Sequence, residues 1–320
     1  MYNNINPKYK TFLFFLIKFT VIVGSLYFIY TKTVNNSQLN FDELLKQLNS
    51  VLFKSNWTIL ILLSFTFFNW LFEIWKWKIL VSYVKNITFQ EASKQSLASH
   101  TISLLTPNRI GEYGGKVIYF PKDKGKILFL NLIGNLYQLS ITILFGVAGT
   151  IYFMNTYNIE IEPRRLRRFA YLIGFVILLF ISKKNRLLKV GTFFKIDKIK
   201  SFFKSMRRKT HLTILSFSII RYLIFSHQFY FSLILFGVDY DYTYLMLLIF
   251  TMYFVASSIP SITLFDWAIK GSVAIYIFSF INITEVIVFT IILLMWILNF
   301  ALPSMVGIFY VLKFKTPYKI

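Results

Sequence analysis

The chain contains no cysteine among its 320 residues. This absence excludes disulfide bonds, thiolate metal sites and a cysteine nucleophile, and it leaves the redox compartment undecided. Charged residues are also scarce at 15% of the chain, whereas they make up about a quarter of an average soluble domain. Hydrophobic residues reach 56%, and the mean hydropathy is +0.60. These proportions exclude an ordinary soluble domain and indicate a polytopic membrane protein.

Residues that commonly carry metal or acid–base chemistry are few as well. The three histidines, His100, His211 and His227, lie far apart and match no metal-ligand spacing. No nucleophile arrangement and no pair of catalytic carboxylates on one element is present, so no catalytic group can be named. The sequence therefore predicts no catalytic residue, no metal site and no cofactor.

Apolar runs long enough to cross about 30 Å of hydrocarbon recur along the whole chain. They predict an all-α, polytopic integral membrane helical bundle with about eight membrane segments, forming a single transmembrane domain over 1–320. The first run lacks a small-residue cleavage site and is interpreted as a retained span. The predicted segments are 11–31, 57–80, 127–153, 169–182, 212–236, 243–259, 270–282 and 285–312. Tryptophans at the ends of the second segment fit interfacial aromatics: Trp57, Trp75 and Trp77.

Charge predicts the orientation. The loop 183–209 carries eleven Lys and Arg against one acid, a net charge of +10. By the positive-inside rule it belongs in the cytoplasm, which places both termini there too. The arginines within 164–168 fall on the opposite side and depart from the rule. Apolar residues at helical spacing make the basic loop a candidate amphipathic helix on anionic lipid. Nucleic-acid binding is the alternative use of such charge, but no recognition motif accompanies it.

The most informative stretch, LLTPNRIGEYGGK (104–116), lies among apolar segments yet is built like a binding loop. A proline, charges and glycines at membrane depth are tolerated only where protein or a water-filled cavity surrounds them. Lysines flank the stretch on both sides, so we interpret about 98–120 as a re-entrant, broken segment. The alternative is a cytoplasmic loop between two spans. Its candidate ligand-binding residues are Thr106, Pro107, Arg109, Gly111, Glu112, Gly114 and Lys116.

A second broken segment, SSIPSITLFDWAIKGS (257–272), again sets a proline ahead of a carboxylate and a cation. Its candidate residues are Pro260, Asp266 and Lys270. Paired interrupted segments in two halves of a chain are a sequence indicator of a transporter's central site and of an inverted repeat. We therefore expect the two broken segments to approach each other inside the bundle.

Polar stripes run along several predicted spans. In 127–153, Asn131, Asn135, Gln138 and Thr142 share one helix face. In 57–80, Glu73 lies three residues before Lys76 and can pair with it. Arg221 stands in the middle of 212–236, where an arginine is costly unless it faces a partner or water. We add Asn135, Gln138 and Arg221 to the candidate binding residues. The alternative is that the amides only join helices by hydrogen bonds.

Three motifs resemble those of a known family, and the similarity covers roughly 11–312. TPNRIGEYGGK resembles the T-P-G-x-I-G-E signature of the membrane domain of lysylphosphatidylglycerol synthases. IWKWKILV (74–81) is similar to that family's Arg-Trp motif, with lysine in place of arginine. FDWAIKGS resembles a second, glycine-rich motif ending in Arg-Glu, but most of the glycines are absent and Gly271 occupies the glutamate's place.

The resemblance implies a bundle of about eight helices with re-entrant segments that moves a lipid between leaflets of a bacterial cytoplasmic membrane. Anionic or lipid-linked membrane lipids are the implied partners. Synthase members carry a cytosolic transferase domain after the membrane part, whereas this chain ends at Ile320. We therefore expect a flippase-like protein and not an enzyme.

Two alternatives remain at this stage. One is a membrane-embedded enzyme on a lipid-linked substrate that uses Glu112 or Asp266 as acid or base. The other is a non-catalytic partner of an envelope-synthesis enzyme. The sequence leaves the lipid, the energy source and the oligomeric state open.

Overall fold

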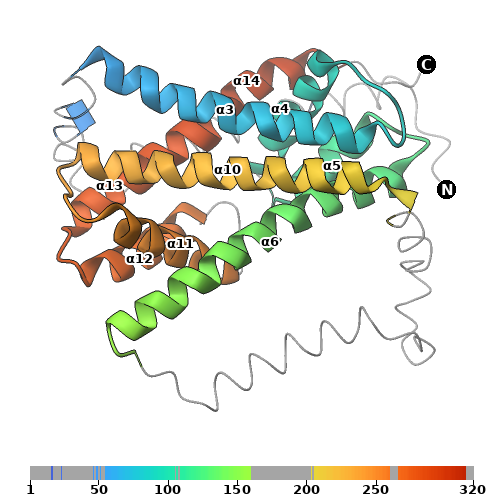
Figure 1. Cartoon of the computed structure of the whole chain (residues 1–320). Coiled ribbons are helices and arrows are strands. Elements are labelled where there is room, and N and C mark those ends of the chain that lie inside the picture. Colours follow the sequence, from blue (N-terminus) through green and yellow to red (C-terminus); the bar gives the residue numbers. More distant parts are fainter. Residues whose placement is uncertain are drawn as a thin grey trace.

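The computed structural model describes residues 55–104, 106, 109–159, 203, 205–259 and 266–314, with a few isolated residues before 55. Across this described part the chain is helical and has no strand. The helices are α3 (Asn56–Val81), α4 (Phe89–Leu104), α5 (Ile110–Ile118), α6 (Lys124–Thr156), α10 (Arg208–Leu235), α11 (Tyr242–Ser258), α12 (Asp266–Ser279), α13 (Glu285–Trp296) and α14 (Leu302–Leu312). A π-helical turn, η2 (Ile297–Ala301), joins α13 to α14 (Figure 1).

The structure confirms the all-α membrane bundle. Within the described residues, four helical stretches are long and apolar enough to cross a bilayer: Trp57–Val81, Lys124–Thr156, Arg208–Leu235 and Glu285–Leu312. They coincide with the predicted segments 57–80, 127–153, 212–236 and 285–312. The predicted segments 11–31 and 169–182, the arginines of 164–168 and nearly all of the basic loop 183–209 lie outside the described residues.

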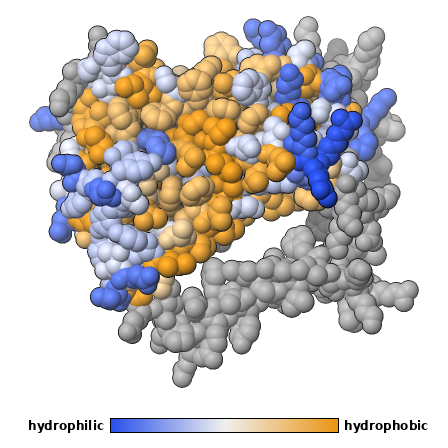
Figure 2. Space-filling model, in the orientation of Figure 1, coloured by the Kyte–Doolittle hydropathy of each residue, from blue (hydrophilic) through white to orange (hydrophobic). Residues whose placement is uncertain are grey.

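The surface also fits a bilayer. Apolar residues cover the middle of the face shown in Figure 2, and hydrophilic residues gather at its left and right ends. Large apolar side chains on several helices point outward, as shown by Trp57 at 71% exposure and by Leu144 and Phe309 at 64% each. In water, contiguous apolar surface of this kind would drive association, whereas acyl chains cover it without cost.

Two apolar clusters mark the two ends of the bundle. One gathers the ends of α3 and α5 with the starts of α4, α6 and α10. The other gathers the second halves of α6, α10 and α12 with residues along the whole of α11 and α13. Helices α3 and α10 therefore run antiparallel, as Figure 1 shows. Hydrogen bonds confirm this direction. Tyr83, just after α3, bonds to Thr210 at the start of α10 at 2.8 Å, and Gln228 near the end of α10 donates to Thr66 in the first half of α3 at 2.9 Å.

Helices α4 and α5 form a hairpin that enters the bundle from one end and turns back halfway. Helix α4 begins in the first cluster and ends near the middle of α3, where the rings of His100 and Trp70 have centroids 4.7 Å apart. Helix α5 then returns to that cluster through Phe120. The entering arm starts at Phe89, well before the predicted 98, because Thr88 and Glu91 form a capping box. Hydropathy missed residues 89–97 of this arm because most of α4 is polar.

Helices α11 and α12 form a second pair that enters from the opposite end. Their outer ends lie beside the end of α6: Tyr244 at the start of α11 bonds to the Tyr157 hydroxyl, and the ring of Phe280 after α12 lies 4.7 Å from that of Tyr157, centroid to centroid. Each half of the described chain thus follows the same order, which is a long helix, a broken helix pair and a further long helical stretch. The halves point in opposite directions, which is the arrangement of an inverted repeat.

Glycines allow the first hairpin to pack closely. A Cβ on Gly115 would lie 2.8 Å from the Cα of Ser99, and one on Gly111 would lie 2.7 Å from the carbonyl oxygen of Ile102. On α14, a Cβ on Gly307 would lie 2.3 Å from the carbonyl oxygen of Leu97. Small residues at helix contacts let backbones approach within a membrane, so these glycines set the position of α4 and α5.

We expect Gly115→Ala to lower the thermal unfolding midpoint of the detergent-solubilised protein, because its new methyl group meets backbone and the overpacking costs about 1–3 kcal/mol. Gly114→Ala is the matched control, since a Cβ there meets nothing within 4 Å. This control should be neutral or slightly stabilising. Equal midpoints for the two variants would contradict the packing role of Gly115.

Candidate functional site

A cavity of about 270 Å³ lies where the two broken segments meet. Cations from three helices or helix ends face it: Arg109 before α5, Arg221 on α10 and Lys270 on α12. None of its described lining residues is a carboxylate. The remaining lining residues are Asn69, Trp70, His100, Gln138, Thr142, Tyr222, Phe225, Tyr253, Ser257, Asn299 and Phe300. The site is thus cationic on one part of its wall and aromatic or hydroxylated elsewhere.

Arg109 is held in an unusual conformation at the break between α4 and α5. Its φ of 57° places it in the left-handed region, which is uncommon for a residue with a side chain. The guanidinium lies 3.2 Å from a carboxylate oxygen of Glu112 and 3.5 Å from Nδ1 of His100. His100 Nε2 lies 3.3 Å from the carbonyl oxygen of Phe300, so Nε2 donates and Nδ1 accepts from Arg109. These contacts direct Arg109 toward the cavity.

The second broken segment reaches the same point. The Lys270 ammonium lies 5.1 Å from the centre of the Phe300 ring, and the Arg109 guanidinium lies 5.8 Å from it. The expected approach of the two segments is therefore observed at these two cations, although about 160 residues of chain separate them. Pro107, Pro260 and the side chain of Asp266 lie outside the described residues.

Arg221 is satisfied by a polar network between the two halves. It donates to Asn69 Oδ1 at 3.0 Å and to Gln138 Oε1 at 3.2 Å, and it pairs with Glu73. Glu73 also forms an ion pair with Lys76 at 2.8 Å, as the spacing of these two residues predicted. A mid-membrane arginine is tolerated only with such partners. The network holds the guanidinium at the cavity wall and leaves Glu73 shared by two cations.

A parallel network lies behind Arg109. Lys116 is 2% exposed and donates to Glu112 at 2.8 Å and to Asn131 at 2.7 Å, and its ammonium lies 4.3 Å from the ring centre of Trp77. Glu112 and Lys116 do not line the cavity. Glu112 therefore orients Arg109, while Lys116 holds Glu112. The prediction that Trp77 is an interfacial aromatic is wrong. Its indole is buried and donates to Gln95 at 2.8 Å.

Other candidate residues shape the break without reaching the cavity. The Thr106 hydroxyl accepts from the Gly111 N–H at 2.7 Å, while Gly114 faces open space. Asn135 donates to the Tyr113 hydroxyl at 2.9 Å and does not line the cavity, so the expected stripe reaches the cavity only at Gln138 and Thr142. The cavity thus brings together four of the predicted binding residues: Arg109, Gln138, Arg221 and Lys270.

The sequence interpretation missed the contribution of η2. Pro303 has no N–H, so the carbonyl of Asn299, four residues earlier, lacks its helical donor. The Trp70 indole donates to that carbonyl instead, at 3.2 Å. The π-helical turn places Asn299 and Phe300 at the cavity. An asparagine four residues before a proline in an apolar span was the available signal.

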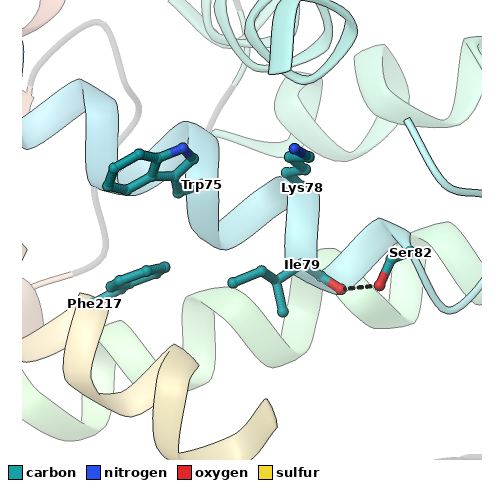
Figure 3. A pocket seen from close by; sticks show the side chains of 5 residues that line it. All are labelled: Trp75, Lys78, Ile79, Ser82 and Phe217. Atoms are coloured by element: carbon teal, nitrogen blue, oxygen red, sulfur yellow. Dashed lines mark hydrogen bonds between the residues drawn. The ribbon is translucent and has the colours of Figure 1, made fainter. Parts of the chain in front are cut away.

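A larger hollow of about 440 Å³ lies on the surface between α3 and α10. Figure 3 shows its five lining residues: Trp75, Lys78, Ile79, Ser82 and Phe217. The rings of Trp75 and Phe217 stack with centroids 6.0 Å apart, and the Ser82 hydroxyl donates to the Ile79 carbonyl at 2.7 Å. Only one charge lines this hollow, so the inner cavity is the better candidate site. Neither contains a cluster of metal-ligating side chains among the described residues.

Comparison with known proteins yields one match. The family described as the lysylphosphatidylglycerol synthase TM region matches residues 15–311, which is nearly the whole chain. No curated protein and no solved structure matches the sequence.

We expect Glu112→Gln to destabilise the protein by about 3–5 kcal/mol, because Lys116 would remain buried without an anionic partner. Asp123→Asn is the matched control, since its pair with Lys126 is 58% exposed on the lysine side and such pairs contribute about 0–1 kcal/mol. Thermal unfolding in detergent measures both. If the two variants unfold at the same temperature, the buried network does not stabilise the hairpin.

We expect a cysteine at Thr142 to react with a water-soluble maleimide, because Thr142 lines the polar cavity. The chain has no native cysteine to interfere. Thr290→Cys is the control, since Thr290 is fully buried in α13 and should stay unlabelled. If Thr142→Cys stays unlabelled when the maleimide reaches one side of the membrane and also when it reaches both, water does not enter the cavity.

Proposed function

Since the chain belongs to the lysylphosphatidylglycerol synthase TM region family, we propose that it is a lipid translocator. Membership links this multi-pass membrane protein to lipid or envelope biosynthesis. The proposed cargo is a phospholipid or a lipid-linked envelope precursor, moved between leaflets of a bacterial cytoplasmic membrane with both termini in the cytoplasm. The observation that carries the proposal is the cationic cavity where two oppositely oriented broken segments meet.

The cations suit a phosphate. Guanidinium groups bind phosphate oxygens through paired, charge-assisted hydrogen bonds, and an ammonium adds a point charge. Arg109, Arg221 and Lys270 converge on one space from different helices. A phosphate entering that space would meet groups already held in position by Glu112 and Glu73.

The place of the cavity suits transport. A headgroup crossing bare hydrocarbon would lose its hydration, at a cost of several kcal/mol for each unsatisfied polar group. A lined cavity replaces that hydration, while acyl tails stay in the lipid. Hairpins that enter from opposite ends supply one movable gate for each side, as in transporters built from inverted repeats.

The arrangement gives less support to catalysis. Glu73 and Glu112 each contact two cations and neither lines the cavity, so a proton bound to either would displace an ion pair. We therefore assign them positioning roles and do not propose an enzyme. Lipids remain the proposed partners, and no observation specifically favours a bound envelope-synthesis enzyme.

We expect Arg109→Ala to slow the exchange of fluorescent phospholipids in proteoliposomes by about 10-fold or more, because a charge-assisted hydrogen bond contributes about 1.5–3 kcal/mol. Folding should be retained, because Glu112 keeps Lys116 and the Arg109 side chain is 44% exposed. Arg109→Lys should be nearly as slow, since it loses the planar fork.

The control for this experiment is Arg208→Ala, an exposed arginine at the start of α10, which should exchange lipid like the wild type. Empty vesicles give the background rate. Unchanged exchange by Arg109→Ala at equal incorporation would remove Arg109 from the transport path. A wild-type rate equal to that of empty vesicles would remove the proposed function itself.

A further inference from the structure

We propose that the cavity selects lipids whose phosphate is joined to a neutral, hydroxyl-bearing headgroup and discriminates against headgroups that carry an ammonium. This inference rests on the proposed function and names the class of its cargo. Three observations carry it: the charges that face the cavity, the hydroxyl groups that also line it, and its size.

The charges disfavour an ammonium. Among the described side chains, the carboxylates nearest the cavity, Glu73 and Glu112, lie behind it and are each engaged by two cations. A headgroup ammonium would instead meet the guanidinium groups of Arg109 and Arg221 on the wall. Like charges brought together in a desolvated site cost several kcal/mol, and this is a common device for rejecting a wrong ligand.

The aromatic and hydroxylated part of the cavity lining offers hydrogen bonds to hydroxyl groups. Tyr253 is 7% exposed and lines the cavity, and its buried hydroxyl has no hydrogen-bond partner among the described residues. A buried hydroxyl without a partner is costly, so each case calls for an explanation such as a ligand that completes it. Tyr222, 4% exposed, lines the cavity beside Tyr253 with their ring centroids 6.4 Å apart.

Two further hydroxyls on this wall present acceptors. Thr142 donates to the Gln138 carbonyl at 3.2 Å, and Ser257 donates to the Phe254 carbonyl at 2.8 Å. Each donation leaves the lone pairs of the hydroxyl oxygen for an incoming donor. A polyol or sugar hydroxyl both donates and accepts, and therefore fits a wall that combines the Tyr253 phenol with Thr142 and Ser257.

The size fits a headgroup alone. Pockets for small ligands usually measure about 300–1,000 Å³, and this cavity, at about 270 Å³, lies just below that range. A lipid bound here would keep its acyl tails outside the cavity.

The test compares lipids that differ only in the headgroup, added to the purified full-length protein in detergent and scored by native mass spectrometry. Dioleoylphosphatidylglycerol carries a phosphodiester and two hydroxyls. Dioleoylphosphatidylethanol has the same charge and no hydroxyl. Lysylphosphatidylglycerol adds two ammonium groups to the first lipid. We expect binding to weaken by about 2- to 10-fold without the hydroxyls and by more than about 10-fold with the ammonium groups.

Tyr253→Phe removes only the phenolic oxygen. It should weaken phosphatidylglycerol binding by about 2- to 10-fold and leave phosphatidylethanol binding unchanged. Tyr276→Phe is the matched control, because Tyr276 is 59% exposed and does not line the cavity. The wild-type comparison stands by itself if the Tyr253 variant fails to fold.

Three results would overturn the inference. Equal binding of phosphatidylglycerol and phosphatidylethanol, unaffected by Tyr253→Phe, would show that the hydroxyl groups of the lining do not select the headgroup. If lysylphosphatidylglycerol binds as tightly as phosphatidylglycerol, and Asp266→Asn abolishes that binding, the cavity accepts a cationic headgroup. Soluble glycerol phosphate binding as tightly as the lipid would assign a ligand without tails. Selective binding without exchange in liposomes would overturn the proposed function alone, whereas exchange without selectivity would overturn only this inference.

Discussion

The arrangement of this bundle depends on the cost of placing charge inside a membrane. Each carboxylate at the centre is shared by two cations, Glu73 by Arg221 and Lys76, and Glu112 by Arg109 and Lys116. Removing the shared carboxylate leaves a buried lysine uncompensated, which costs more than the pair itself contributes. The pairs therefore fix geometry: Arg221 with Glu73 joins α10 to α3 and so joins the two halves.

The same cost governs the backbone at its breaks. A carbonyl that loses its helical donor at membrane depth must find another partner. At η2, Trp70 supplies that donor to Asn299, and the Asn299 side chain accepts from Asn69 at 3.0 Å and donates to Gln228 at 2.9 Å. A local irregularity thus becomes a junction among α3, α10 and the last helical stretch. The aromatic ring that both hairpin cations approach, Phe300, is placed by this junction.

Hydropathy and spacing predicted what depends on local pattern. The long helices followed from apolar length, the Glu73–Lys76 pair from its spacing, and the first break from the proline and glycines of 104–116. The polar arm of α4 was not predictable in this way, because its buried residues include polar ones, Gln95, Ser96, Ser99 and Ser103, and form no apolar stripe. Tertiary contacts alone decide that Trp77 is buried and that Asn135 bonds to Tyr113. For Gly111 and Gly115, the sequence indicated a ligand loop, whereas the backbone of α4 explains both.

The cavity has two unlike walls, and this difference bears on how a bound phosphate would act. One wall is the cross-linked junction of α3, α10 and η2, where Arg221 is held by Asn69, Glu73 and Gln138. The other consists of the ends of two hairpins, which bring Arg109 and Lys270 from opposite ends of the bundle (Figure 1). A phosphate that contacts all three cations would connect each hairpin end to the fixed junction. Because coupling between sites is reciprocal, an anion that draws in one hairpin end would then favour the position of the other. A single headgroup would in this way link the two gates, since it is the one component that touches both.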